Sequence, residues 1–226
     1  MRLTTLSVAL LAAGCVHSPQ PAPVVPGPIN TIEAEIAPDR AADSLLVDVR
    51  TIEPGIVVDL RYATANNFTG APLPGYSANR AYLRREAAVA LGRVQRRLRQ
   101  QGLGLKVFDA YRPARATSAM VDWTKRANRA DLLSDGYIAS RSRHNLGVAI
   151  DLTLVELAGG KELEMGTPFD TFSAAAHTAN ASGQVALNRQ MLKVEMEREG
   201  FANYAQEWWH FSFRVPDPLR FDRPIR

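Results

Sequence analysis

The stretch SRHNLGVAIDLTL, residues 142–154, contains the pattern that decides the fold. From Gly147 onward its side chains alternate in character, with one face formed by Val148, Ile150, Leu152 and Leu154. An apolar side chain at every second position predicts a β-strand with a buried face. Asp151 then lies on the opposite face, and His144 comes just before the strand. The strand therefore carries two potential metal ligands at one end.

The stretch EWWHFSFRV, residues 207–215, repeats this arrangement near the C-terminus. Its apolar stripe consists of Trp209, Phe211, Phe213 and Val215, so His210 lies on the other face of a predicted strand. Glu207 precedes His210 by three residues. Strict alternation would place Glu207 on the Trp209 face, so Glu207 can approach His210 only if the strand begins after it or contains a bulge there.

The rest of the chain mixes helices and strands without a regular βαβ order. Apolar spacing predicts helices over 83–104, 116–128 and 187–200, and strands over 56–62 and 105–110. The arginines of 83–104 fall between the apolar positions, which predicts a solvated helix face. We therefore expect an α+β fold, with a mixed, largely antiparallel sheet flanked by helices.

The chain has 226 residues and a net charge of +4, which suits one globular domain. The charge is spread rather than clustered and no nucleic-acid-binding motif is present, so we expect no nucleic-acid partner. The one cysteine, Cys15, excludes an internal disulfide.

Residues 1–15 have the layout of a signal peptide: Arg2, an apolar run over 6–13 that is too short to span a bilayer, and small residues before Cys15. This end resembles a bacterial lipobox. We therefore expect an exported, periplasmic protein anchored to a membrane by a lipid on Cys15; the alternative is an ordinary signal peptide and a soluble periplasmic protein. Residues 16–44 are proline-rich and predict a tether, although 36–44 could pack on the domain, and 45–226 predict the domain itself.

Two imidazoles and one carboxylate, from His144, Asp151 and His210, form a ligand set that suits one catalytic Zn²⁺ with an open position. Glu207 is the nearest candidate for a general base. Each residue also has a structural alternative, because a histidine in a strand is usually structural and a buried aspartate can cap a turn.

Three motifs in the same order resemble the zinc D-Ala-D-Ala peptidases: FDAYRP (108–113), SRHNLGVAID (142–151) and EWWHF (207–211). Further segments resemble the D-alanyl-D-alanine dipeptidase branch known from vancomycin resistance: RYATANNFTG (61–70), PGYSANR (74–80) and MGTPFD (165–170). The resemblance covers about residues 45–215. It implies the hedgehog-like fold of that peptidase family.

The resemblance also implies roles for individual residues. His144, Asp151 and His210 would be the zinc ligands, Glu207 the base that takes a proton from the attacking water, and Arg112 the cation that stabilises the oxyanion. Asp109 would orient Arg112, or would simply pair with it across a turn.

Four further residues match segments that would contact the substrate: Ser142, Asp170, Tyr62 and Tyr76. Asp170 would bind the free ammonium of a dipeptide. Ser142 and Asp170 could instead cap turns, and the two tyrosines could belong to the core. His177 has no matching ligand motif, and we expect it to lie in a loop or on the surface.

These residues predict a zinc metallopeptidase that hydrolyses D-alanyl-D-alanine to two D-alanines, in turnover of cell-wall peptides. One alternative is a periplasmic D,D-carboxypeptidase that trims peptidoglycan stem peptides. Another is an inactive cell-wall-binding lipoprotein, although binding alone would not need the three ligands together with Glu207 and Arg112. The sequence leaves the oligomeric state open.

Overall fold

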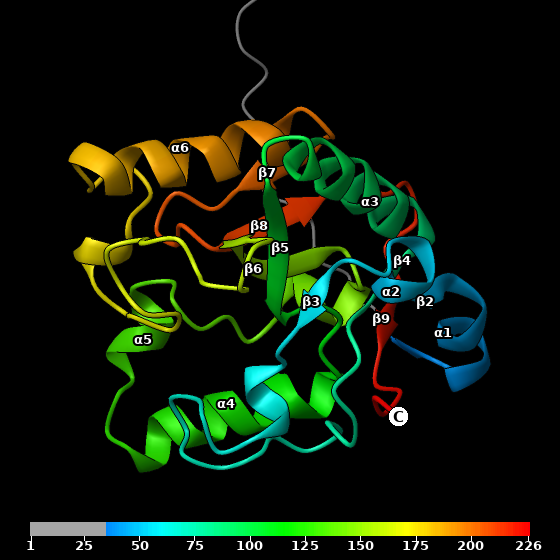
Figure 1. The fold of residues 1–226 in the computed structure, drawn as a ribbon. Coiled ribbons are helices and arrows are strands. Elements are labelled where there is room, and N and C mark those ends of the chain that lie inside the picture. Colours follow the sequence, from blue (N-terminus) through cyan, green and yellow to red (C-terminus); the bar gives the residue numbers. More distant parts are fainter. Residues whose placement is uncertain (1–34) are drawn as a thin grey trace, which may run out of the picture. The chain divides into compact units, whose positions relative to one another are not determined.

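A five-stranded sheet with the order β3-β5-β6-β8-β7 forms the centre of the fold (Figure 1). It is seen in a computed structural model, which describes residues 35–226. Its strands are β3 (Val57–Val58), β5 (Leu103–Asp109), β6 (Ala149–Glu156), β8 (His210–Phe213) and β7 (Phe201–Asn203). Only the β3–β5 pair is parallel in this sheet. The predicted α+β class with a largely antiparallel sheet is confirmed.

Helices cover both faces of this sheet. Figure 1 shows α3 (Arg85–Arg99) and α6 (Gly183–Glu197) on one side and α4 (Ala114–Arg126) on the other. As a result β6, the middle strand, is buried from Ala149 to Val155 on both faces. Its alternation therefore separates two buried environments, one apolar and one polar, rather than a core from solvent.

Smaller elements surround the central layers. Two strand pairs are present, β1 (Ile36–Ala37) with β9 (Arg220–Phe221) in parallel and β2 (Leu46–Asp48) with β4 (Tyr82–Arg84) antiparallel. The remaining helical segments are α1 (Asp39–Leu45), α2 (Val49–Ile52), η1 (Arg61–Ala63), α5 (Asp131–Ser134), η2 (Arg143–Leu146) and η3 (Ala174–Ala176). None of the helices in the described part of the chain has the length and apolar character needed to span a bilayer.

Two predicted segments differ in the structure. The strand expected over 56–62 is reduced to β3, because the Asn79 side chain accepts a hydrogen bond from the Leu60 amide (2.9 Å) and donates one to the Val58 carbonyl (2.9 Å). Residues 36–44, assigned to the tether, form β1 and most of α1, and β1 pairs with β9. The predicted signal peptide, Cys15 and the tether up to residue 34 lie outside the described residues.

Candidate active site

Three adjacent strands place three polar side chains in one row across the sheet. Asp109 of β5 is paired with Asp151 of β6, and Asp151 is paired with His210 of β8. Directly paired residues of neighbouring strands project from the same face. The row therefore lies on a single face, and a register irregularity between Val107 and Asp109 adjusts its end on β5.

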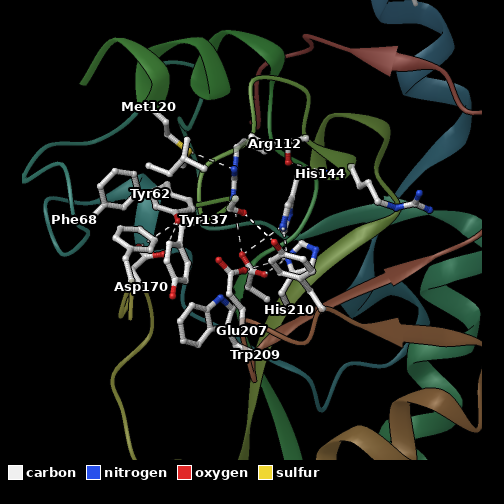
Figure 2. A pocket seen from close by; sticks show the side chains of 18 of the residues that line it. Tyr62, Phe68, Arg112, Met120, Tyr137, His144, Asp170, Glu207, Trp209 and His210 are labelled. Atoms are coloured by element: carbon white, nitrogen blue, oxygen red, sulfur yellow. Dashed lines mark hydrogen bonds and ion pairs between the residues drawn. The ribbon is translucent and has the colours of Figure 1, made fainter. Parts of the chain in front are cut away.

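His144 completes a group of three potential metal ligands with this row (Figure 2). Its Nε2 lies 3.2 Å from His210 Nδ1 and 3.4 Å from Asp151 Oδ2, and His210 Nδ1 lies 2.9 Å from Asp151 Oδ1. All the ligand atoms are within 4.8 Å of one another. The structure thus brings the predicted ligands together from β6, β8 and η2.

The donors of this group fit a zinc ion. His144 Nδ1 is 2.6 Å from the Ala110 carbonyl, which accepts its proton and leaves the Nε2 lone pair free for a metal. Two imidazole nitrogens and a carboxylate form a donor set that zinc favours. Desolvation by burial is the main cause that lowers the pKa of His210, which favours the neutral ring that a metal ligand needs.

Glu207 lies beside the ligands because β8 begins only at His210. The chain turns before the strand: the Glu207 amide donates to the Tyr204 carbonyl, and the His210 amide donates to the Glu207 carbonyl (3.2 Å). This turn breaks the alternation and brings Glu207 Oε2 to 3.9 Å from His210 Nδ1. Burial raises the pKa of Glu207 well above its ordinary value, and the Asp151 and Asp170 carboxylates raise it further.

Arg112 places a buried cation next to the ligands. Asp109, which is fully buried, accepts hydrogen bonds from Arg112 Nε (2.9 Å) and from the Tyr76 hydroxyl (2.6 Å). Arg112 Nη2 is 3.9 Å from Asp151 Oδ2. The Asp109–Arg112 pair expected from the sequence is therefore present, and it points the guanidinium at the metal group.

The residues expected to contact substrate separate into two groups. Tyr62, Ser142 and Asp170 line a cavity of about 280 Å³ together with the ligands, Arg112 and Glu207. Tyr76 does not line it, because its hydroxyl is occupied by Asp109. The position predicted for Tyr76 is thus corrected from the cavity wall to the support of Asp109.

Asp170 and Ser142 are each fixed by a neighbour. Both Asp170 oxygens accept from the Tyr62 hydroxyl, at 2.9 and 3.2 Å, and Asp170 adopts a positive φ of 61°. Burial raises the pKa of Asp170 to about 8. Ser142 caps η2 by accepting from the His144 amide, so its capping role and its place in the cavity are compatible.

Sequence reasoning missed much of the apolar wall of the cavity, which includes Phe68, Met120, Tyr137, Phe172 and Trp209. The aromatic character of Phe68 and Phe172 was a usable signal, because each lies within or beside a segment that resembles the dipeptidases. Tyr137 carried no such signal. Trp209 was expected only to pack, and it is nearly fully buried while it also forms part of the wall.

The sequence profile of the D-Ala-D-Ala dipeptidase family matches residues 42–224. The D-alanyl-D-alanine dipeptidase of Enterococcus faecium is 39% identical over 189 residues, which span 76% of this chain and 94% of the relative. The enzyme of the same name from Streptomyces coelicolor A3(2) is 38% identical over 188 residues (76% and 93%), and that of Escherichia coli K12 is 34% identical over 169 (74% and 83%).

A solved structure of the vancomycin resistance D,D-dipeptidase VanXYg, in complex with a D-Ala-D-Ala phosphinate analogue, is more distant. It aligns with a TM-score of 0.38 at 19% identity, over 62% of this chain and 54% of that one. The sequence matches are what decide the assignment: with a family profile over residues 42–224 and relatives that align over most of their length, the chain belongs to the D-Ala-D-Ala dipeptidase family.

Proposed function

We propose that this protein is a zinc metallopeptidase that hydrolyses D-alanyl-D-alanine to two molecules of D-alanine. One observation carries the proposal: a single small cavity holds the ligand group of His144, Asp151 and His210, together with a carboxylate and a cation beside it. Its volume of about 280 Å³ is below the roughly 300–1,000 Å³ of pockets for drug-sized ligands. A cavity of this size suits a substrate as small as a dipeptide. Relatives that align over most of the chain carry this activity in their names.

The two ionic side chains beside the ligand group have complementary tasks. When bound, zinc supplies Lewis acidity that polarises the scissile carbonyl and lowers the pKa of water. Glu207 takes a proton from the attacking water and returns it to the departing amine, because its carboxylate lies beside the ligand group, with Oε2 3.9 Å from His210 Nδ1. Arg112 stabilises the negative charge that develops on the carbonyl oxygen, because Asp109 holds its guanidinium in place beforehand.

Asp170 gives the cavity its means of recognising a free dipeptide. Figure 2 shows Asp170 on one side of the cavity and His144 and His210 on the other, with Arg112 and Glu207 between them. A substrate amine bound at Asp170 therefore places the following carbonyl near the ligand group. The aspartate offers two acceptor oxygens in the wall of a narrow site, and in its ionised form it would pair with an unblocked ammonium.

We also propose that the enzyme acts outside the cytoplasm, in wall turnover or use of D-alanine. The support is the N-terminal sequence alone, with its apolar run and Cys15. Cell fractionation together with labelling by a radioactive fatty acid tests this. The labelled protein should appear in the membrane fraction, and Cys15→Ser should lose the label. Full-length, unprocessed protein in the cytosol would refute export.

The activity test compares two substrates on the purified protein: D-alanyl-D-alanine and N-acetyl-D-alanyl-D-alanine. Released D-alanine is measured before chelation, after chelation and after zinc is returned. We expect zinc-dependent cleavage of the free dipeptide, with the acetylated one a poor substrate. Preferential cleavage of the acetylated peptide would instead indicate a carboxypeptidase, and cleavage of neither by the zinc-loaded protein would refute both peptidase assignments.

A further inference from the structure

His177 is the one described histidine outside the ligand group, and it contacts the cavity wall. Its Nε2 lies 3.1 Å from the Tyr137 hydroxyl, and the two rings are tilted with centroids 6.3 Å apart. Tyr137 lines the cavity, whereas His177 is not among the lining residues. Any effect of His177 on the site therefore passes through Tyr137.

The backbone around His177 is held firmly, so it can serve as an anchor. The His177 carbonyl accepts from the Arg189 side chain (2.8 Å), and the next amide, of Thr178, donates to Ala205 (2.9 Å). The Trp208 amide donates to the carbonyl of Ala176, which is fully buried. These bonds tie the segment around His177 to the segment that carries Glu207.

Tyr137 belongs to a loop, residues 135–142, that connects α5 to η2 and forms one side of the cavity. Hydrogen bonds hold the first half of this loop: the Asp135, Gly136 and Ile138 amides donate to Asp131 (2.8 Å), Leu133 (3.3 Å) and Leu132 (2.8 Å), and the Gly136 carbonyl accepts from the Tyr204 hydroxyl (3.1 Å). The Tyr137–His177 bond is what holds the hydroxyl of the Tyr137 side chain itself. Partial burial raises the pKa of Tyr137, so its hydroxyl stays protonated near neutral pH.

A chain of ring contacts connects Tyr137 to the residue that would bind the substrate amine. The Tyr137 ring packs on Phe172 (5.8 Å between centroids), which packs on Phe68 (5.1 Å), which packs on Tyr62 (6.1 Å). The Tyr62 hydroxyl donates to Asp170. The rings thus form an aromatic wall around the amine end of the cavity, and Figure 2 shows Tyr137 between Asp170 and Glu207.

We propose that Tyr137 is a specificity-determining residue that closes the amine end of the cavity against substrates with a blocked amino group, and that His177 is its positioning residue. An acyl group on the substrate nitrogen would extend past Asp170 into the aromatic wall. Tyr137 is the member of this wall whose hydroxyl is held by His177, so the position of its ring depends on that bond. This inference rests on the proposed dipeptidase function and identifies the residues that restrict the enzyme to substrates with a free amino group.

The test measures kcat and KM of the zinc-loaded protein for D-alanyl-D-alanine and for N-acetyl-D-alanyl-D-alanine. The variants are Tyr137→Ala, which opens the wall; Tyr137→Phe and His177→Ala, which each remove the bond from one side; and His177→Gln, which restores a hydrogen-bonding group. Tyr111→Phe is the matched control, because the buried Tyr111 hydroxyl donates to the Arg223 carbonyl (2.8 Å) and Tyr111 is not among the residues that line the cavity.

We expect Tyr137→Ala to raise kcat/KM for the acetylated peptide relative to the free dipeptide by about tenfold or more, in the range that pocket shape alone supplies. His177→Ala and Tyr137→Phe should shift this ratio in the same direction by a smaller factor. A double variant with both substitutions should shift the ratio no further than either single variant, because both remove the same bond. His177→Gln should restore most of the wild-type ratio. Tyr111→Phe should lower Tm without changing the ratio of the two kcat/KM values.

An unchanged ratio in Tyr137→Ala and His177→Ala, each with full zinc content, would overturn the inference while leaving the dipeptidase assignment intact. If Tyr137→Ala does not fold, the two single-bond variants decide in the same way. A wild-type protein that cleaves no free dipeptide would contradict the proposed function itself, so the two failures are distinguishable.

Discussion

Arginine–carboxylate pairs occur in two regions of the molecule that differ in burial. On the outer layer, Arg97 of α3 contacts Glu195 of α6 (2.7 Å) and Glu199 just after α6, and Arg93 also contacts Glu199. In the site, Arg112 contacts Asp109 at 2.8 Å. The Arg93 and Arg97 side chains are 47% and 25% exposed, whereas those of Arg112 and Asp109 are 10% and 0% exposed.

The outer pairs help to hold α3 against the segment around α6, whereas the pair in the site holds a cation beside the ligand group. Ion pairs near water are screened by solvent and salt, and each contributes little to stability. A buried pair costs desolvation free energy, and removal of one partner leaves an uncompensated charge. We therefore expect substitutions in the site to have large effects on activity, and substitutions between α3 and α6 to have small effects on stability alone.

The largest effect should follow from Glu207→Gln, which keeps the shape of the side chain and removes the base. Loss of general base catalysis should lower kcat by about 10²–10⁴-fold. Zinc content and Tm should change little, because Glu207 is not one of the three ligands. Measured zinc stoichiometry is the control. Near-normal kcat in a zinc-loaded Glu207→Gln protein would refute the role of Glu207.

Asp109→Asn should come next, because it breaks the buried pair without touching the substrate. We expect kcat/KM to fall by about 10²–10³-fold, comparable with the loss of one oxyanion-stabilising group. Stability should fall by about 3–5 kcal/mol, since Arg112 is left buried and unpaired. Tyr76→Phe, which removes the other hydrogen bond to Asp109, should lower both quantities by less. If Asp109→Asn matched the wild type, the buried pair would be no more important than the outer ones.

A smaller effect concerns pH. Burial raises the pKa of Asp170 to about 8, so at pH 6 its carboxyl is protonated in the free enzyme and cannot pair with an ammonium. As the pH rises toward 8 the carboxylate forms, and KM for the free dipeptide should fall. Above about 8 the substrate loses its own ammonium proton, and KM should rise again.

Asp170→Asn is the control for the predicted fall of KM between pH 6 and 8, and its KM is measured over the same pH range. This variant should have a raised KM at every pH and should lack the fall between pH 6 and 8. If KM of Asp170→Asn still fell between pH 6 and 8, the fall in the wild-type protein would have to come from the titration of another group.

The smallest effect should come from Arg97→Met in the outer layer. The methionine keeps much of the apolar stem, so unfolding in urea should show a loss of about 1 kcal/mol or less. The loss should shrink as salt is raised, and kcat/KM should stay at the wild-type value. A loss of several kcal/mol would show that the contacts between α3 and α6 resemble the buried pair after all.

The sequence predicted the parts of the fold where one periodicity dominates. Alternation placed β6 and β8, and apolar spacing placed α3, α4 and α6, each to within a few residues. The solvated arginine face expected on α3 was only partly correct, because Arg97 contacts Glu195 of α6 and Arg93 contacts Glu199 just after it. Packing between elements distant in sequence decides that point, and periodicity does not report it.

The site was predictable to a similar extent and for a related reason. His144, Asp151, His210 and Arg112 lie in recognisable motifs, and the structure brings them together. For Glu207, periodicity left two possibilities, and the turn before β8 decides between them. The Tyr137–His177 contact joins residues 40 apart without any motif, so only the tertiary structure could reveal it.

The row of paired residues across β5, β6 and β8 connects the supply of metal to the lifetime of the protein. A cation held by Asp151 and His210 would bridge two neighbouring strands at one level of the sheet, so β8 could not detach without releasing it. Binding to the folded state alone stabilises it by about 2.7 kcal/mol when the free metal concentration is 100 times its Kd. Where zinc is scarce, the empty protein should therefore open more often at β8 and be degraded sooner by proteases, so that metal starvation removes the enzyme as well as its activity.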